Sequence, residues 1–112
     1  MPSKYRAVRV TIDGVTFASK KEAARYQELR LMERAGLISN LELQPAFELI
    51  PPYTTKDGKK IQKIVYKADF KYTYPQTGRE IIEDVKGMKT AIYKLKKKIL
   101  LWRYPEIIFK ES

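Results

Sequence analysis

The chain has 112 residues, a length that suits one domain with its own hydrophobic core. It has no cysteine and no histidine, which excludes disulfides, thiolate zinc sites, Ser-His-Asp triads and histidine acid–base catalysis. Its 23 Lys and Arg against 13 Asp and Glu give a formal charge of +10, which attracts polyanions. A solvated charged surface is the alternative. Nucleic acid is the favoured partner, because the charge is large and is not confined to a tail.

The N-terminal part is predicted to form a β-ribbon. Apolar and polar residues alternate up to Ile12, and Asp13-Gly14 is a strong signal for a tight hairpin turn. We assign residues 1–18 to this ribbon and residues 19–112 to the core of the same single domain. No apolar run approaches the roughly 20 residues of a membrane span, and no signal-peptide pattern is present. The expected location is therefore cytoplasmic, with no membrane partner.

A helix is predicted directly after the ribbon. Ser19-Lys20-Lys21-Glu22 is a capping-box pattern, in which both end side chains satisfy free backbone amides. The helix is expected to run to Ala35 and to stop at Gly36. Its apolar residues are expected to face the core: Ala24, Tyr26, Leu29, Leu31, Met32 and Ala35.

Three strands follow in the prediction. The first lies within residues 41–50 and is centred on Phe47-Glu48-Leu49-Ile50. Residues 61–74 form the second and residues 79–86 form the third, since both are rich in β-branched and aromatic types. Pro75-Gln76-Thr77-Gly78 joins the last two strands, and its proline and glycine suit a four-residue loop. The result is an antiparallel meander.

A second helix is expected from about Thr90 to Arg103, followed by a last strand over residues 106–110. Apolar residues of this helix recur at spacings of three, four and three, which predicts one buried face: Ile92, Leu95, Ile99 and Trp102. The order of ribbon, helix, three-strand meander, helix and strand predicts an α/β fold with a mixed sheet between helices.

The meander places two acids together. If Tyr74 faces Arg79 across the loop, Asp69 lies opposite Asp84, with Cβ atoms roughly 4.5–5.5 Å apart. Like charges so placed destabilise a sheet, and a Mg²⁺ or Mn²⁺ ion would reverse that penalty. A slip of one residue would exchange Asp84 with Glu83, which is otherwise expected to face the opposite side and to have no catalytic role.

Asp84-Val85-Lys86 adds a lysine on the same strand face as the acid. This arrangement suits phosphodiester hydrolysis: the two acids and the Val85 carbonyl would hold the metal, and Lys86 would contact the scissile phosphate or the attacking water. The alternative is a cross-strand charge ladder in which lysines neutralise the acids. Composition and spacing favour neither. A further Asp-x-Lys triplet, starting at Asp57, lies in a predicted turn and has no assigned role.

Ala68-Asp69, followed by Asp84-Val85-Lys86, resembles the core motif of the PD-(D/E)XK nuclease superfamily, with Ala68 in place of the name-giving proline. The element order over about residues 19–110 resembles its restriction-endonuclease-like core. Residues 17–23 and 83–87 resemble a small phage-encoded family of nuclease-like proteins, and are similar to Holliday-junction resolvases and transposon nuclease subunits. The resemblance implies a Mg²⁺- or Mn²⁺-dependent DNA endonuclease in phage replication or recombination, acting in the host cytoplasm on branched DNA.

The resemblance also implies further site residues. An acid of the first helix often completes the metal site in that superfamily, and Glu22 is the matching position; its alternative role is that of the capping partner of Ser19. Gln44 corresponds to a polar position sometimes found near such sites, or simply ends a loop. A resolvase cuts two strands symmetrically, which one small chain achieves most simply as a homodimer.

The second helix carries the predicted DNA contacts: Lys89, Lys94, Lys97 and Lys98. Free N–H groups at the start of this helix can hold a phosphate, and the lysines would follow the DNA backbone outward. The alternative is a solvated helix face. Two other functions stay open, namely a non-catalytic nucleic-acid-binding domain with a nuclease-like fold and a nuclease subunit that acts only in a larger assembly.

Overall fold

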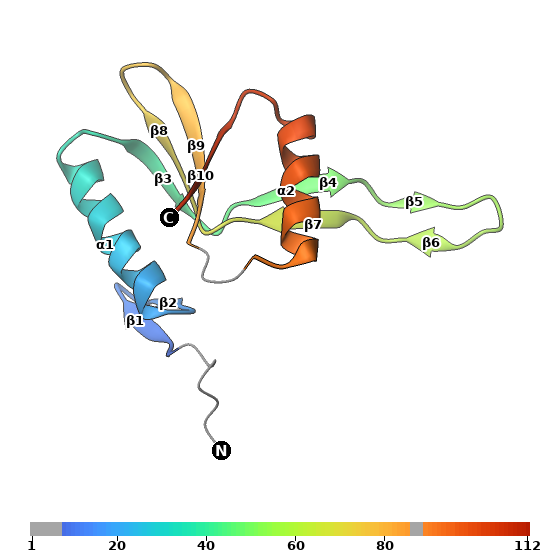
Figure 1. Cartoon of the computed structure of the whole chain (residues 1–112), viewed down its shortest axis with the longest axis horizontal. Coiled ribbons are helices and arrows are strands. Elements are labelled where there is room, and N and C mark those ends of the chain that lie inside the picture. The colour runs from blue at the N-terminus through green and yellow to red at the C-terminus, as the bar shows by residue number, and fades with distance from the viewer. Residues whose placement is uncertain (1–7, 86–88) are drawn as a thin grey trace.

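The computed structural model describes residues 8–85 and 89–112. This part of the chain is an α/β domain in which a mixed sheet lies between two helices, α1 (Lys20–Arg34) and α2 (Ala91–Arg103) (Figure 1). Within the same ranges no helix is both long and apolar enough to cross a membrane. The α/β class predicted from the sequence is confirmed.

The predicted N-terminal ribbon and first helix both form. Strands β1 (Val10–Ile12) and β2 (Val15–Phe17) pair antiparallel around a turn at Asp13 and Gly14, both with positive φ. Ser19 is the N-cap of α1, and its Oγ accepts a hydrogen bond of 3.1 Å from the backbone amide of Glu22. The helix ends at the predicted position because Gly36 adopts a left-handed conformation, with φ of 78°.

The buried face of α1 is rotated from the predicted one. Glu22, Ala23, Tyr26 and Leu29 are buried, whereas the expected core residues Ala24, Leu31 and Ala35 are exposed. Tyr26 and Leu29 are the large side chains that pack against the sheet, and their spacing sets the rotation of the helix. The prediction for the three exposed residues was therefore wrong.

The first two strands of the predicted meander are interrupted. The first is divided into β3 (Ser39–Leu43) and β4 (Ala46–Ile50) by Gln44, which has a φ of +51°, and by Pro45, which has no amide for a ladder. The second is also divided. Its pieces and the remaining strands are β5 (Tyr53–Thr54), β6 (Lys60–Ile61), β7 (Ile64–Lys67), β8 (Phe70–Tyr74), β9 (Arg79–Asp84) and β10 (Ile108–Glu111).

Four strands of the described chain form the main sheet, in the order β10, β9, β8, β3. Strand β10 runs parallel to β9, and the other neighbours are antiparallel. It begins two residues later than predicted and extends to Glu111. The paired strands β4 and β7 leave this sheet and continue into β5 and β6 as a two-stranded arm that projects from the domain (Figure 1).

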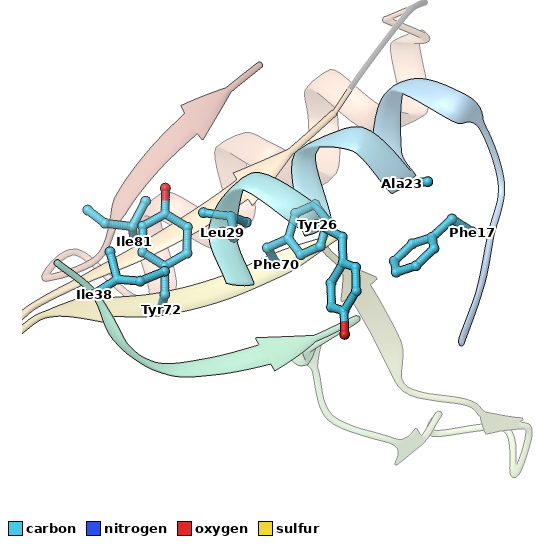
Figure 2. Packing of buried hydrophobic residues seen from close by; sticks show 8 residues of the cluster. All are labelled: Phe17, Ala23, Tyr26, Leu29, Ile38, Phe70, Tyr72 and Ile81. Carbon is cyan, nitrogen blue, oxygen red and sulfur yellow. The ribbon is translucent and has the colours of Figure 1, made fainter. Parts of the chain in front are cut away.

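Each face of the sheet has its own apolar cluster. The cluster under α1 consists of Phe17, Ala23, Tyr26, Leu29, Ile38, Phe70, Tyr72 and Ile81 (Figure 2). The cluster under α2 consists of Leu49, Tyr66, Ala68, Ile82, Tyr93 and Leu100. Ile81 and Ile82 belong to different clusters because successive strand residues point to opposite faces. By the same alternation Glu83 lies on the α1 side and Asp84 on the α2 side.

The buried face of α2 is also not the predicted one. Tyr93 and Leu100 are buried, whereas Ile92, Leu95 and Trp102 are exposed. Ile99 is partly buried against the α2 cluster. Tyr93 packs near the rings of Tyr66 and Phe109, which fixes the helix in this orientation. The prediction that the apolar stripe forms the core was therefore wrong for its three exposed residues.

Candidate functional site

Asp69 lies at the point where the chain passes from the arm into the main sheet. Strand β7 pairs with β4 and ends at Lys67, and β8 pairs with β3 from Phe70 onward. The amide of Ala68 donates to the carbonyl of Pro45 at 3.0 Å, and the amide of Gln44 donates to the carbonyl of Asp69 at 2.9 Å. The backbone of Asp69 is thus fixed on both sides by the bend between β3 and β4.

Asp69 and Asp84 meet across neighbouring strands. The register of β8 and β9 is the predicted one, with Phe70 opposite Glu83. The amide of Asp69 donates to Asp84 Oδ1 at 3.1 Å, and the amide of Val85 donates to Asp69 Oδ2 at 2.7 Å. Each carboxylate therefore binds the backbone of the opposite strand, and the two side chains face the same end of the sheet.

The donor set at this junction fits a divalent cation with an open coordination sphere. Mg²⁺ is commonly held by one or two carboxylates and takes its other ligands from water and phosphate. Asp69 and Asp84 supply two such carboxylates. Among the described residues, no group of three or more His, Cys, Asp or Glu is arranged to hold a metal. The hydrogen bond from the backbone amide of Glu22 to Ser19 Oγ shows that Ser19 caps α1, and Glu22 is buried at the start of this helix. The role of Glu22 as a third ligand stays a prediction.

Two residues that the sequence did not single out, Tyr93 and Glu111, adjoin the acid pair. Glu111 of β10 stands in parallel register with Asp84, and its Oε2 accepts a hydrogen bond of 2.7 Å from the Tyr93 hydroxyl. Burial, this hydrogen bond and the charges of Glu111, Asp84 and Asp69 raise the pKa of Tyr93. Tyr93 therefore stays protonated at neutral pH and acts as a hydrogen-bond donor. The prediction ended the last strand one residue short of Glu111.

Glu111 also binds two of the predicted DNA-contacting lysines. Its Oε1 lies 3.2 Å from Lys97 Nζ and 3.5 Å from Lys89 Nζ. The hydrogen bond from Tyr93, opposed by burial, and the two lysine charges lower the pKa of Glu111. Lys97 Nζ further lies 4.6 Å from the ring centroid of Phe109, a cation–π contact.

The four predicted DNA-contacting lysines line one cavity. Its volume is about 360 Å³, and it is lined by Lys89, Tyr93, Lys94, Lys97, Lys98, Leu101 and Glu111. The structure thus brings these lysines together on the side of α2 where Tyr93 faces the acid pair. This cavity is called the lysine pocket below.

Glu83 occupies the opposite face of β9 and is fully buried. Its carboxylate accepts hydrogen bonds from Arg25, from the Tyr72 hydroxyl at 2.6 Å and from the Ser112 hydroxyl at 2.7 Å. Burial opposes its ionisation, but these bonds together lower the pKa of Glu83 below its ordinary value. The expected orientation away from Asp84 is confirmed, and the network around Glu83 was not foreseen.

Two predicted residues remain. Lys86 lies outside the described residues. Gln44 is exposed, and its backbone amide donates a hydrogen bond to the carbonyl of Asp69. Its side chain lines a separate cavity of about 240 Å³ beside the N-terminal ribbon, together with Arg9, Thr16, Phe17 and Ala18. Gln44 therefore supports the backbone of Asp69 and lines a neighbouring cavity, not the lysine pocket.

Comparison with known proteins identifies the family of the chain. Residues 2–111 match the family described as protein of unknown function (DUF1064), and because this match covers nearly the whole chain, the protein belongs to that family. No curated protein and no solved structure matches it.

Proposed function

We propose that this DUF1064 protein is a metal-dependent DNA endonuclease with a restriction-endonuclease-like core. The observation that supports the proposal is the junction at which Asp69 and Asp84 face one end of the sheet, next to the lysine pocket. An acid pair that suits a hard cation and a basic cavity that suits phosphate are the two parts that phosphodiester hydrolysis needs.

Asp69 and Asp84 would hold Mg²⁺ or Mn²⁺, together with the Val85 carbonyl. The bound cation would activate a water and withdraw charge from the phosphate. Lys89 and Lys97 then neutralise DNA phosphates beside the acids. Lys86 is proposed, from the motif alone, to stabilise the charge that develops on the scissile phosphate.

Tyr93 lies between the acid pair and the lysine pocket and forms part of the lining of that pocket. Its hydroxyl donates to Glu111, and its raised pKa keeps that proton in place at neutral pH. Tyr93 is therefore a positioning group and not a general base. Since the chain has no histidine, the proton of the attacking water would be accepted by a carboxylate, a lysine or solvent.

The partner in this proposal is DNA. A resolvase would act on branched DNA as a homodimer. Its location would be the cytoplasm of the cell or of a phage host. A non-catalytic DNA-binding domain would bind DNA without cutting it. A subunit of a larger nuclease would cut only after its partner is added.

The decisive experiment is cleavage of supercoiled, linear and four-way-junction DNA by the purified chain, with Mg²⁺, with Mn²⁺ and with EDTA. Asp84→Asn should lower the rate at least about 100-fold, because loss of metal binding removes several kcal/mol of transition-state stabilisation. Asp57→Asn is the matched control, since Asp57 lies in the turn between β5 and β6 and also begins an Asp-x-Lys triplet. Equal rates for the two variants, or metal-independent cleavage, would contradict the proposal.

A further inference from the structure

Helix α2 exposes an apolar stripe that has no role in the site. Ile92, Leu95 and Trp102 are 68%, 60% and 81% exposed, and Trp102 is the single tryptophan of the chain. The buried side of the same helix is formed by Tyr93 and Leu100. Large apolar side chains grouped on one helix face mark an interaction surface. The name α2 stripe refers below to these three exposed residues.

The spacing of the α2 stripe matches the seam of a coiled coil. Ile92, Leu95, the partly buried Ile99 and Trp102 follow one another at intervals of three, four and three residues, as a and d positions do. A second helix can therefore pack along this face. With 13 residues, α2 offers about two heptads of such a seam.

The residues that flank the seam are basic. Lys96, Lys98 and Arg103 occupy e and g positions of the two heptads, and residues 91–103 contain no Asp or Glu. Lys96 Nζ donates to the carbonyl of Val65, and Arg103 Nη1 donates to the carbonyl of Leu49. Both side chains are held beside the seam by these bonds.

This charge pattern decides between the candidate partners. Pairing of α2 with α2 of a second copy would set basic flanks against basic flanks, which opposes association. DNA would engage the lysines but leave Ile92 and Leu95 in contact with water. We infer that the α2 stripe binds an amphipathic helix whose apolar seam is flanked by Glu or Asp. The inference does not depend on the proposed nuclease activity, because it uses no residue of the acid pair and shares only Lys98 with the lysine pocket.

Trp102 provides the readout. The probe is a synthetic peptide of about three heptads with Leu at a and d and Glu at e and g. It should shift the Trp102 emission of the full chain to shorter wavelength and saturate. A control peptide with the same composition but shuffled apolar positions should cause no such shift. A second control peptide, with Lys at e and g, should not bind.

The variants are matched for exposure. Leu95→Ser should weaken binding of the acidic peptide about tenfold or more, because it removes apolar area from the seam. Leu37→Ser, at a residue that is also 60% exposed but lies beyond α1, should leave the affinity unchanged. Thermal melts of both variants should match the parent, since both side chains are exposed.

Four results would overturn the inference. If the Leu95→Ser variant bound the acidic peptide as tightly as the parent does, the contact would lie elsewhere on the surface. If the shuffled peptide bound as tightly as the acidic peptide, charge alone would explain the binding. A concentration-dependent emission shift without peptide, with a dimer in sedimentation, would make a second copy the occupant. A shift with duplex DNA but not with the acidic peptide would assign the α2 stripe to nucleic acid.

Discussion

Arg25 of α1 donates to both carboxylate oxygens of Glu83 on β9, at 2.6 Å from Nε and 3.0 Å from Nη2. The pair joins a helix and a strand that are far apart in the sequence. Because Glu83 is fixed on the α1 side of β9, its neighbour Asp84 is held on the α2 side, next to Asp69. The buried ion pair thus fixes the orientation of the candidate site without belonging to it.

The first prediction concerns this pair. Glu83→Gln should lower the free energy of unfolding at pH 7 by about 3–5 kcal/mol, because it leaves the Arg25 charge with a neutral partner at a largely buried position. Glu80→Gln is the control: its pair with Lys71 on the same sheet is partly exposed and is worth at most about 1 kcal/mol. Urea unfolding of both variants measures the difference, and equal losses would contradict the structural role of Glu83.

The pH dependence of stability follows from the lowered pKa of Glu83. The pKa of Glu83 is lowered in the folded state, so its stabilising contribution is complete above the unfolded value of about 4.3 and is lost as the pH falls through the folded value. Urea unfolding of the parent should therefore show a decline below about pH 4.5 that is smaller in Glu83→Gln. Parallel pH profiles of the parent and Glu83→Gln would argue against this assignment.

The second prediction separates the two roles of Glu22. Glutamine keeps the capping geometry beside Ser19 but removes the charge. If Glu22 acts only at the start of α1, Glu22→Gln should leave both the melting temperature and the cleavage rate nearly unchanged. A loss of activity as large as that of Asp84→Asn would establish Glu22 as a third ligand.

The third prediction concerns Glu111, whose carboxylate forms ion pairs with Lys89 and Lys97. Under the proposed function, Glu111 would compete with DNA phosphate for these two lysines. Glu111→Gln should raise the affinity for duplex DNA and steepen the dependence of log K on log salt by up to about 1.8, which corresponds to two additional phosphate contacts. Glu106→Gln changes the net charge equally at an exposed residue and serves as the control. Identical salt slopes for the two variants would exclude competition at the lysine pocket.

The fourth prediction tests the lysine pocket directly. Changing Lys94, Lys97 and Lys98 together to Ala should flatten the salt slope by up to about 2.7 and weaken binding almost uniformly across DNA sequences. The control changes Lys56, Lys59 and Lys60, around the tip of the arm, and alters the net charge by the same amount. Titrations over a range of salt concentrations decide the matter. An equal effect of both triple variants would mean that charge alone, and not the pocket, drives binding.

The register of the candidate site was predictable from local sequence. A four-residue loop at Pro75–Gly78 fixes how β8 meets β9, and this places Asp69 beside Asp84. The boundaries of α1 were equally accessible, because Ser19 and Gly36 are strong helix signals. Both features depend on residues that are close in the chain.

The features that were not predicted depend on distant partners. The spacing of apolar residues in α2 shows that the helix has an apolar face, but it does not show which face packs inward. Tyr93 packs inward in place of Leu95, because Glu111 accepts a hydrogen bond from its hydroxyl. The interruption at Asp69 likewise follows from the bend at Pro45 in the neighbouring strand. Sequence periodicity within one segment carries no information about the surface that segment meets.

The position of both acids around one hairpin has a consequence for the order of folding. Asp69 and Asp84 are joined by the short loop of β8 and β9, so the chain between them closes quickly compared with longer connections. Glu111 and Ser112 reach β9 only after α2 and the parallel strand β10 have docked. We expect the carboxylate pair to assemble early, as local structure, and the C-terminal segment to complete its surroundings in a later step.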